Sequence, residues 1–266
     1  MTKIIQISDT HLVKEGCLVS KTLETAASLK NLVGRISKIK LEVGSIDAII
    51  VSGDISDDGT AESYQRFKSI LSSLELPIFL VPGNHDVRSI FRSEFLSAGY
   101  LPKAGKLNWH KKVGEIHIIG LDTLIEGQGG GELDGDTLKF LESTLEKLGN
   151  APTLLMLHHP PFKSGIEFMD AIGLHTGRES LGDILSSYCG ELIVVCGHIH
   201  TNIITRLRGH TVISAPSTCS SFVYNIHNDA PVEVLKQEGG LILHDWSEGF
   251  KSIQIEAMRG EALFPF

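Results

Sequence analysis

Short apolar runs that end in polar clusters recur along this chain and constrain its fold more than any other feature. Each run is too short for a helix, and Asp, Asn or His follows it closely. The clusters are Asp9 and His11 after KIIQIS, Asp54 after AIIVSG, Asn84, His85 and Asp86 after IFLVPG, His158 and His159 after TLLML, and His198 and His200 after LIVVCG. Such runs predict strands buried on both faces. Because ligands bind at the carboxyl ends of parallel strands, we expect the clusters to share one crevice.

Segments with helical spacing alternate with these runs, which predicts an α/β core. Expected strands cover residues 3–7, 47–51, 76–81, 115–121, 153–157 and 192–196, and expected helices cover 22–41, 61–74, 89–98, 136–148 and 178–188. Hairpins over 201–214 and 241–257, the second turning at Glu248 and Gly249, indicate some antiparallel pairing. We expect one domain over residues 1–266, in which the polar excursion 217–240 caps a site or pairs subunits.

Composition excludes several classes of protein. The 266 residues include 24 Lys and Arg against 32 Asp and Glu, a net charge of −8 that disfavours binding to a nucleic acid polymer. No apolar window approaches the ~18 residues of a membrane span, and the N-terminus lacks the pattern of a signal peptide. The four cysteines form no C-x-x-C pair, which favours reduced thiols and a cytoplasmic location.

The residue types in the clusters select a metal chemistry. Carboxylates, imidazoles and one amide oxygen, without thiolate, suit Mn, Fe, Co or Zn. The one-residue gaps in Asp9-Thr10-His11 and His198-Ile199-His200 direct both side chains to one side of an extended backbone. One ion needs fewer ligands than are present, whereas two ions with a bridging carboxylate would use them all. The seven candidate ligands are Asp9, His11, Asp54, Asn84, His158, His198 and His200.

The order D-x-H, G-D, G-N-H-D, H-H, G-H-x-H resembles that of the calcineurin-like metallophosphoesterases over roughly residues 3–215. The resemblance implies a four-layer α/β/β/α sandwich, with two mixed central sheets flanked by helices and a metal site at the C-terminal ends of the strands. One metal would be held by Asp9, His11 and His200, and the other by Asn84, His158 and His198, with Asp54 bridging them. The resemblance also implies that His85 stabilises the transition state or protonates the leaving group, and that Asp86 orients His85.

Several residues near these motifs have two interpretations. His159 either lines the site or bonds to backbone. The resemblance implies that Phe162, Met169 and Asp170 approach the leaving group, whereas core packing is the alternative for Phe162 and Met169. Asp57 and Asp58 are assigned to a solvated loop.

The HHPPF segment (His158–Phe162) resembles the branch of class III cyclic-nucleotide phosphodiesterases and bacterial glycerophosphodiesterases. That branch implies hydrolysis of small phosphodiesters, such as cyclic AMP or glycerophosphodiesters, by a metal-bridging hydroxide. The arginine that grips a monoester dianion in related protein phosphatases is replaced by Asp58, which agrees with a diesterase. A phosphomonoesterase or nucleotidase and a non-catalytic scaffold remain the alternatives. The resemblance favours a homodimer or higher homo-oligomer.

Overall fold

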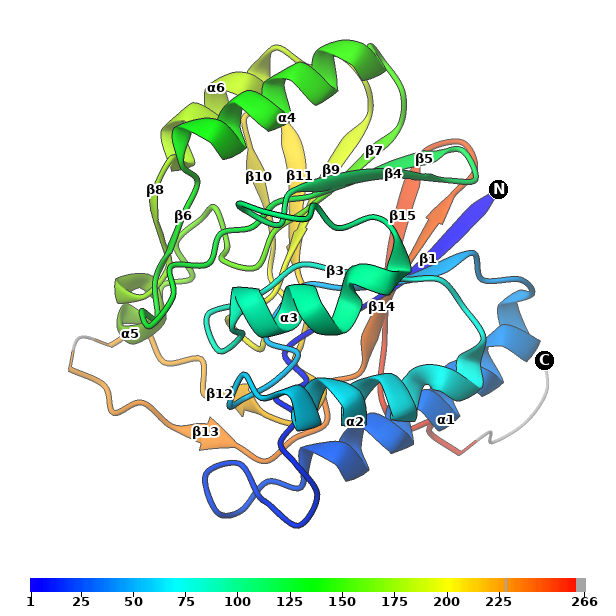
Figure 1. The fold of residues 1–266 in the computed structure, drawn as a ribbon, viewed down its shortest axis with the longest axis vertical. Coiled ribbons are helices and arrows are strands. Elements are labelled where there is room, and N and C mark those ends of the chain that lie inside the picture. The colour runs from blue at the N-terminus through cyan, green and yellow to red at the C-terminus, as the bar shows by residue number, and fades with distance from the viewer. Residues whose placement is uncertain (228, 262–266) are drawn as a thin grey trace.

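The chain folds around two β-sheets that pack face to face (Figure 1). The computed structural model describes residues 1–227 and 229–261. The first sheet has the order β15-β14-β1-β2-β3, in which β1, β2 and β3 are parallel and β14 and β15 are antiparallel additions. Its strands are β1 (Thr2–Ile7), β2 (Ala48–Val51), β3 (Ile78–Leu80), β14 (Leu241–Trp246) and β15 (Phe250–Ile255).

The second sheet has the order β10-β11-β9-β7-β5-β4. Strands β5, β7, β9 and β11 are parallel, and each edge carries one antiparallel strand. The strands are β4 (Trp109–Val113), β5 (Ile116–Gly120), β7 (Thr153–Met156), β9 (Leu192–Cys196), β10 (Ile204–Leu207) and β11 (His210–Ser214). Both sheets are therefore mixed, as predicted.

Helices cover the outer faces of the two sheets and complete the predicted four layers (Figure 1). On the first sheet lie α1 (Thr25–Val43), α2 (Ala61–Leu71) and α3 (Arg88–Phe95), with the 3-10 turns Ser72–Leu74 and Leu96–Ala98 after α2 and α3. On the second sheet lie α4 (Gly135–Leu148) and α6 (Arg178–Ser186). None of the helices in the described ranges is both long and apolar enough to cross a membrane.

The apolar runs are continuous because the strands are buried on both faces. Along β9, Ile193 and Val195 join the core between the two sheets, whereas Leu192, Val194 and Cys196 join the core beneath α4 and α6. This alternation follows from the two-residue period of a strand. The core between the sheets is continuous and holds the strands that carry the polar clusters in fixed positions.

Four features of the structure are absent from the sequence prediction. Strand β4 was missed because its sequence, WHKKV, is half polar, as suits an exposed edge strand. A short helix, α5 (Glu167–Ala171), follows the HHPPF segment. Two small ribbons also form: β6 (Gly131–Glu132) with β8 (Leu174–Thr176), and β12 (Ser221–Phe222) with β13 (Val234–Leu235). The second of these lies within the excursion 217–240 (Figure 1).

Candidate metal centre

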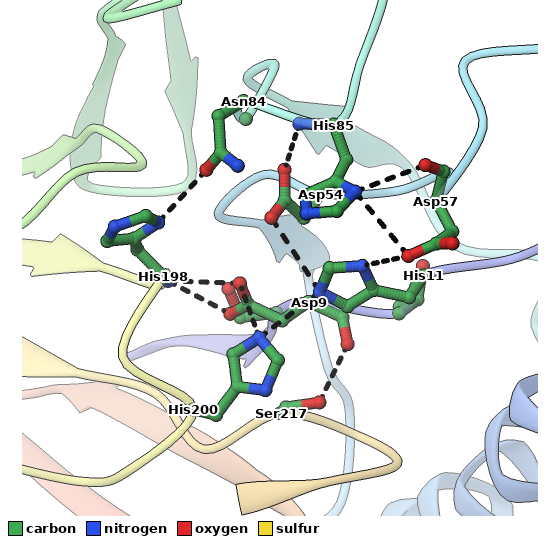
Figure 2. Close-up of polar contacts among 12 residues, drawn as sticks. Asp9, His11, Asp54, Asp57, Asn84, His85, His198, His200 and Ser217 are labelled. Carbon is green, nitrogen blue, oxygen red and sulfur yellow. Dashed lines mark hydrogen bonds and ion pairs between the residues drawn. The ribbon is translucent and has the colours of Figure 1, made fainter. Parts of the chain in front are cut away.

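The polar clusters of both sheets meet in one place, at the C-terminal ends of β1, β2, β3, β7 and β9 (Figure 2). Loops after the first three strands bring carboxylates, the Asn84 amide and two histidines from the first sheet. Loops after β7 and β9 bring the remaining histidines from the second sheet. The centre therefore lies between the edges of the two sheets, where strands of both sheets end.

One group of atoms, here called site A, joins Asp9, His11, His200 and Asp54. Nε2 of His11 lies 3.1 Å from Nε2 of His200 and 3.6 Å from Oδ2 of Asp54. Nε2 of His200 lies 3.5 Å from Oδ1 of Asp9. Ligand atoms around one tetrahedral or octahedral ion lie about 3.0–3.5 Å apart when the metal–ligand bonds are about 2.1 Å. The spacing in site A is therefore that of ligands around one ion.

A second group, site B, joins Asn84, His158, His198 and Asp54. Oδ1 of Asn84 lies 3.1 Å from Nε2 of His158 and 3.0 Å from Nδ1 of His198. Nε2 of His158 lies 3.4 Å from Oδ2 of Asp54. The same carboxylate oxygen, Oδ2 of Asp54, therefore belongs to both groups. The other oxygen of this carboxylate accepts the backbone N–H of His85 at 2.9 Å.

Hydrogen bonds outside the groups orient the imidazoles as ligands. Nδ1 of His158 donates to the carbonyl oxygen of Ser52 at 2.8 Å, and Nδ1 of His11 donates to Oδ1 of Asp57 at 3.0 Å. Each Nε2 then presents a lone pair to the centre, as in metal-binding histidines. A lone pair on His11 that faces His200 at 3.1 Å needs a proton or a cation between them. The donor set thus fits divalent cations.

Burial and charge compete within the centre. Burial raises the pKa of Asp9 to about 6. Burial alone would lower the pKa of His11 and His158. The hydrogen bond to Asp57 and the charge of Asp54 outweigh burial at His11 and raise its pKa to about 9. The charge of Asp54 does the same at His158, whose pKa is also raised to about 9. Because divalent cations compete with these protons, we expect metal affinity to rise with pH up to about 9.

Backbone strain is concentrated at the centre. Five candidate ligands have positive φ: Asp9 (51°), His11 (43°), Asp54 (50°), His198 (72°) and His200 (52°). Non-glycine residues in this region cost about 1–3 kcal/mol each, and they cluster at functional sites. The sequence prediction that these segments are extended is therefore wrong, because left-handed residues, rather than a strand, turn both side chains of each D-x-H and H-x-H pair inward.

Two glycines allow the close approach of the ligands. A Cβ on Gly83 would lie 2.2 Å from Oδ1 of Asp54. A Cβ on Gly197 would lie 2.7 Å from Oδ2 of Asp9 and 2.1 Å from Oγ of Ser8. All three distances are too short for a Cβ atom, so no other residue fits at Gly83 or Gly197. Contact with the carboxylates therefore requires the glycines of G-N-H-D and G-H-x-H.

His85 is more exposed than the candidate ligands around it, with 41% of its side chain accessible. Its ring lies 4.8 Å from that of His11. Its Nδ1 lies 3.1 Å from the carbonyl oxygen of Asp57 and 3.4 Å from Oδ1 of the same residue. Asp57 therefore contacts two histidines of the centre, and its assignment to a solvated loop is wrong. Its place three residues after Asp54, on the same loop, is the one sequence signal for this role.

Asp86 does not orient His85. Its buried carboxylate accepts the backbone N–H groups of Gly83, Ile55 and Ser56 at 2.8–3.3 Å and the hydroxyl of Tyr64 at 3.0 Å. These bonds tie the loop after β2 to the loop after β3, so Asp86 positions Asp54 and Asn84 instead. The prediction failed because the carboxylate turns inward to satisfy buried backbone donors.

The residues with predicted substrate contacts all make contacts within the fold. His159 is fully buried, with Nδ1 2.8 Å from Oγ1 of Thr123 and Nε2 donating to the Gly129 carbonyl, so both ring nitrogens are occupied. Met169 is buried beside Ile166 and Ile199. Asp170 accepts the backbone N–H groups of Ser164 and Gly165 and thereby closes the loop after HHPPF. Phe162 is half-buried between two apolar clusters.

A two-sheet sandwich that gathers histidine, carboxylate and amide groups at its strand ends has the donor set of a two-metal site, as metal-dependent hydrolases do. The sequence profile described as calcineurin-like phosphoesterase matches residues 2–202. The chain therefore belongs to the calcineurin-like phosphoesterase family.

Individual proteins show the same relationship. A probable glycerophosphodiester phosphodiesterase of Arcobacter nitrofigilis is 34% identical over 245 residues, which cover 92% of this chain and 89% of the relative. A 3′,5′-cyclic-nucleotide phosphodiesterase of a Nostoc species is 30% identical over 257 residues, covering 95% and 91%. The crystal structure of a dimetal phosphatase from Danio rerio has the same fold, with a TM-score of 0.69 at 14% identity and coverage of 97% and 99%.

Proposed function

We propose that the protein is a dimetal phosphodiesterase that hydrolyses small phosphodiesters, either 3′,5′-cyclic nucleotides or glycerophosphodiesters. The single observation that carries this proposal is the shared oxygen of Asp54, which lies 3.6 Å from a ligand atom of site A and 3.4 Å from one of site B. The names of the relatives at 34% and 30% identity support a diester substrate.

Asp9, His11 and His200 would hold one ion, Asn84, His158 and His198 the other, and Asp54 both. Two divalent ions in such a site supply Lewis acidity to a phosphoryl group and lower the pKa of a water molecule. The oxygen and nitrogen donors suit Mn, Fe, Co or Zn.

His85 is placed to act on the substrate itself. Asp57 holds its Nδ1, and the exposed ring leaves Nε2 for a substrate oxygen. In its doubly protonated form the imidazole donates one N–H to Asp57 and the other to a phosphoryl or leaving-group oxygen. We assign His85 the role of general acid, and Asp57 the role of holding its ring.

The charges near the centre favour a diester over a monoester. Asp58, which replaces the arginine of related protein phosphatases, accepts the hydroxyl groups of Ser63 and Thr60 at the start of α2. Arg88, three residues after His85, donates to the buried carboxylate of Asp122 at 2.7 Å, so its charge is paired with Asp122. A diester carries one negative charge fewer than a monoester dianion and needs one cation fewer.

We also propose a role for the excursion 217–240, as a cap over the centre and a contact between two copies of the chain. Tyr224, Ile226 and Val234 are exposed apolar residues of this segment, which supports such a contact. Light scattering would show a dimer that is lost when Ile226 and Val234 are changed to serine. The four cysteines are free thiols, which supports a cytoplasmic location for a one-domain enzyme.

Hydrolysis assays test the proposed activity. Protein stripped of metal and supplied with Mn²⁺ is assayed on bis(p-nitrophenyl) phosphate and p-nitrophenyl phosphate, then on cyclic AMP and glycerophosphoethanolamine. We expect a larger kcat/KM for the diesters. A clear preference for the monoester would indicate a phosphomonoesterase. No turnover with Mn²⁺, or with Fe, Co or Zn in its place, would indicate a scaffold protein.

A further inference from the structure

The segment Ser217–Phe222, which follows β11, packs directly against site A although it lies beyond the part of the chain that matches the family profile. Oγ of Ser217 donates to the backbone carbonyl of Asp9 at 2.8 Å (Figure 2). Oγ of Ser220 shares a hydrogen bond of 3.0 Å with Nδ1 of His200. The ring of Phe222 lies 5.0 Å from that of His200.

Backbone hydrogen bonds hold the segment and its two serines against the centre. The backbone N–H groups of Cys219 and Ser220 donate to Oγ of Ser217, at 3.2 and 3.4 Å, and the backbone N–H of Ser217 donates to the carbonyl of His200. Both hydroxyls are buried. These bonds fix the backbone of Ser220, so its buried hydroxyl offers His200 a partner at a defined position.

Site B has a different support. The outer nitrogen of His158 bonds to the carbonyl of Ser52, which directly follows strand β2, between β1 and β3 in the first sheet. In site A, the outer nitrogen of His200 bonds instead to a loop that continues into the ribbon of β12 and β13. Tyr224, just after β12, donates to the carbonyl of Ser164 in the loop after HHPPF. The support of site A is therefore connected to the proposed cap.

We propose that Ser220 is a positioning residue for His200, and that its hydroxyl sets the metal affinity of site A without affecting site B. The hydroxyl of Ser220 accepts a hydrogen bond from the Nδ1–H of His200 and thereby keeps Nε2 directed towards the centre. This inference rests on the proposed dimetal site. It adds a residue that follows β11 to that site, and it makes the affinities of the two ions depend on different supporting residues.

Calorimetric titration of the metal-stripped protein with Mn²⁺ tests the inference. We expect two binding events in the unchanged protein and a 10- to 100-fold higher Kd for one of them in Ser220→Ala, about the usual effect of removing a partner of a ligand. Asn84→Ala identifies the event at site B, because its amide oxygen lies in site B alone. Ser221→Ala is the matched control, since that hydroxyl bonds to Gln237 instead.

A second measurement separates positioning from a general structural role. With Co²⁺ bound, the ring N–H protons of coordinated histidines give strongly shifted, exchangeable NMR signals. In Ser220→Ala we expect one signal, that of His200, to exchange faster with water, while the signal of His158 keeps its rate because the Ser52 carbonyl is unchanged.

The outcomes distinguish the inference from the proposed function. If Ser220→Ala binds both ions as the unchanged protein does, or loses affinity equally at both sites, the inference is overturned and the dimetal site stands. If the unchanged protein binds fewer than two ions, the dimetal site fails and the inference fails with it.

Discussion

His244 makes stability depend on pH in a way that can be calculated. It lies in β14 and is fully buried between the sheets. Its Nε2 donates to Oε1 of Gln6 at 3.0 Å, and its Nδ1 accepts the hydroxyl of Ser252 at 2.8 Å. The Gln6 amide in turn donates to Oγ of Ser52 and to the Cys196 carbonyl. This network satisfies neutral His244, and burial lowers its pKa to about 3.

The sign and size of the effect follow from this shift. The pKa is about 3 in the folded protein and has its ordinary value of 6.5 when unfolded, so stability is complete above pH 6.5 and is lost as the pH falls towards 3. Protonation of the unfolded state alone costs about 0.1 kcal/mol at pH 7.5 and about 1.4 kcal/mol at pH 5.5. We therefore expect His244 to account for about 1.3 kcal/mol of the stability lost between these pH values.

Urea denaturation at pH 7.5 and 5.5, with a chelator present, measures this contribution. His244→Gln keeps a donor for Gln6 and an acceptor for Ser252 but does not titrate, so its free energy of unfolding is expected to fall by about 1.3 kcal/mol less than that of the unchanged protein. His227→Gln is the control, because His227 is exposed. A His244→Gln variant with the pH dependence of the unchanged protein would refute the reasoning.

Three further predictions concern the centre. Asn84→Ala is expected to weaken site B more than site A in a metal titration monitored by activity, and equal weakening would contradict the ligand assignment. His85→Ala is expected to retain both ions by elemental analysis while kcat falls about 10²- to 10⁴-fold, and loss of metal would contradict its role. Gly83→Ala would place a Cβ 2.2 Å from Oδ1 of Asp54, so both sites are expected to lose metal. Gly135→Ala, with no neighbouring atom within 4 Å, is its control, and equal metal content in the two variants would exclude the contact.

The α/β core was predictable because its central strands are apolar on both faces, whereas the four-layer arrangement was implied by the family resemblance. Runs such as LIVVC have few alternatives to a buried parallel strand, and β9 covers the predicted residues 192–196. Elements with little apolar surface were not predictable. The edge strand β4 is half polar, and the strands β12 and β13 have only two residues each, so neither carries an apolar pattern that predicts it.

The candidate ligands could be named from the sequence because each follows a strand end directly. Their conformation could not, since the positive φ of Asp9 or His198 depends on contacts between loops of different strands. The roles of the residues around the ligands were harder still to predict. Asp57 contacts His85, the role predicted for Asp86, whereas backbone donors that only the fold brings together draw the carboxylate of Asp86 inward.

Ser220 had no signal in the sequence at all. Its role depends on β11 returning beside β9, which brings the following loop against His200. A serine in a run of small polar residues has no pattern that would indicate such a partner, so contacts of this kind require a structure.

Anomalous diffraction from crystals grown with Mn²⁺ tests the central claim most directly, because it locates each ion and its ligands. The account predicts two peaks about 3.5–4 Å apart, as in other two-metal sites, both bonded to Asp54. The ion at one peak would be bonded to His11 and His200, and the ion at the other to Asn84 and His158. A single peak, or two peaks that do not share Asp54, would contradict the account.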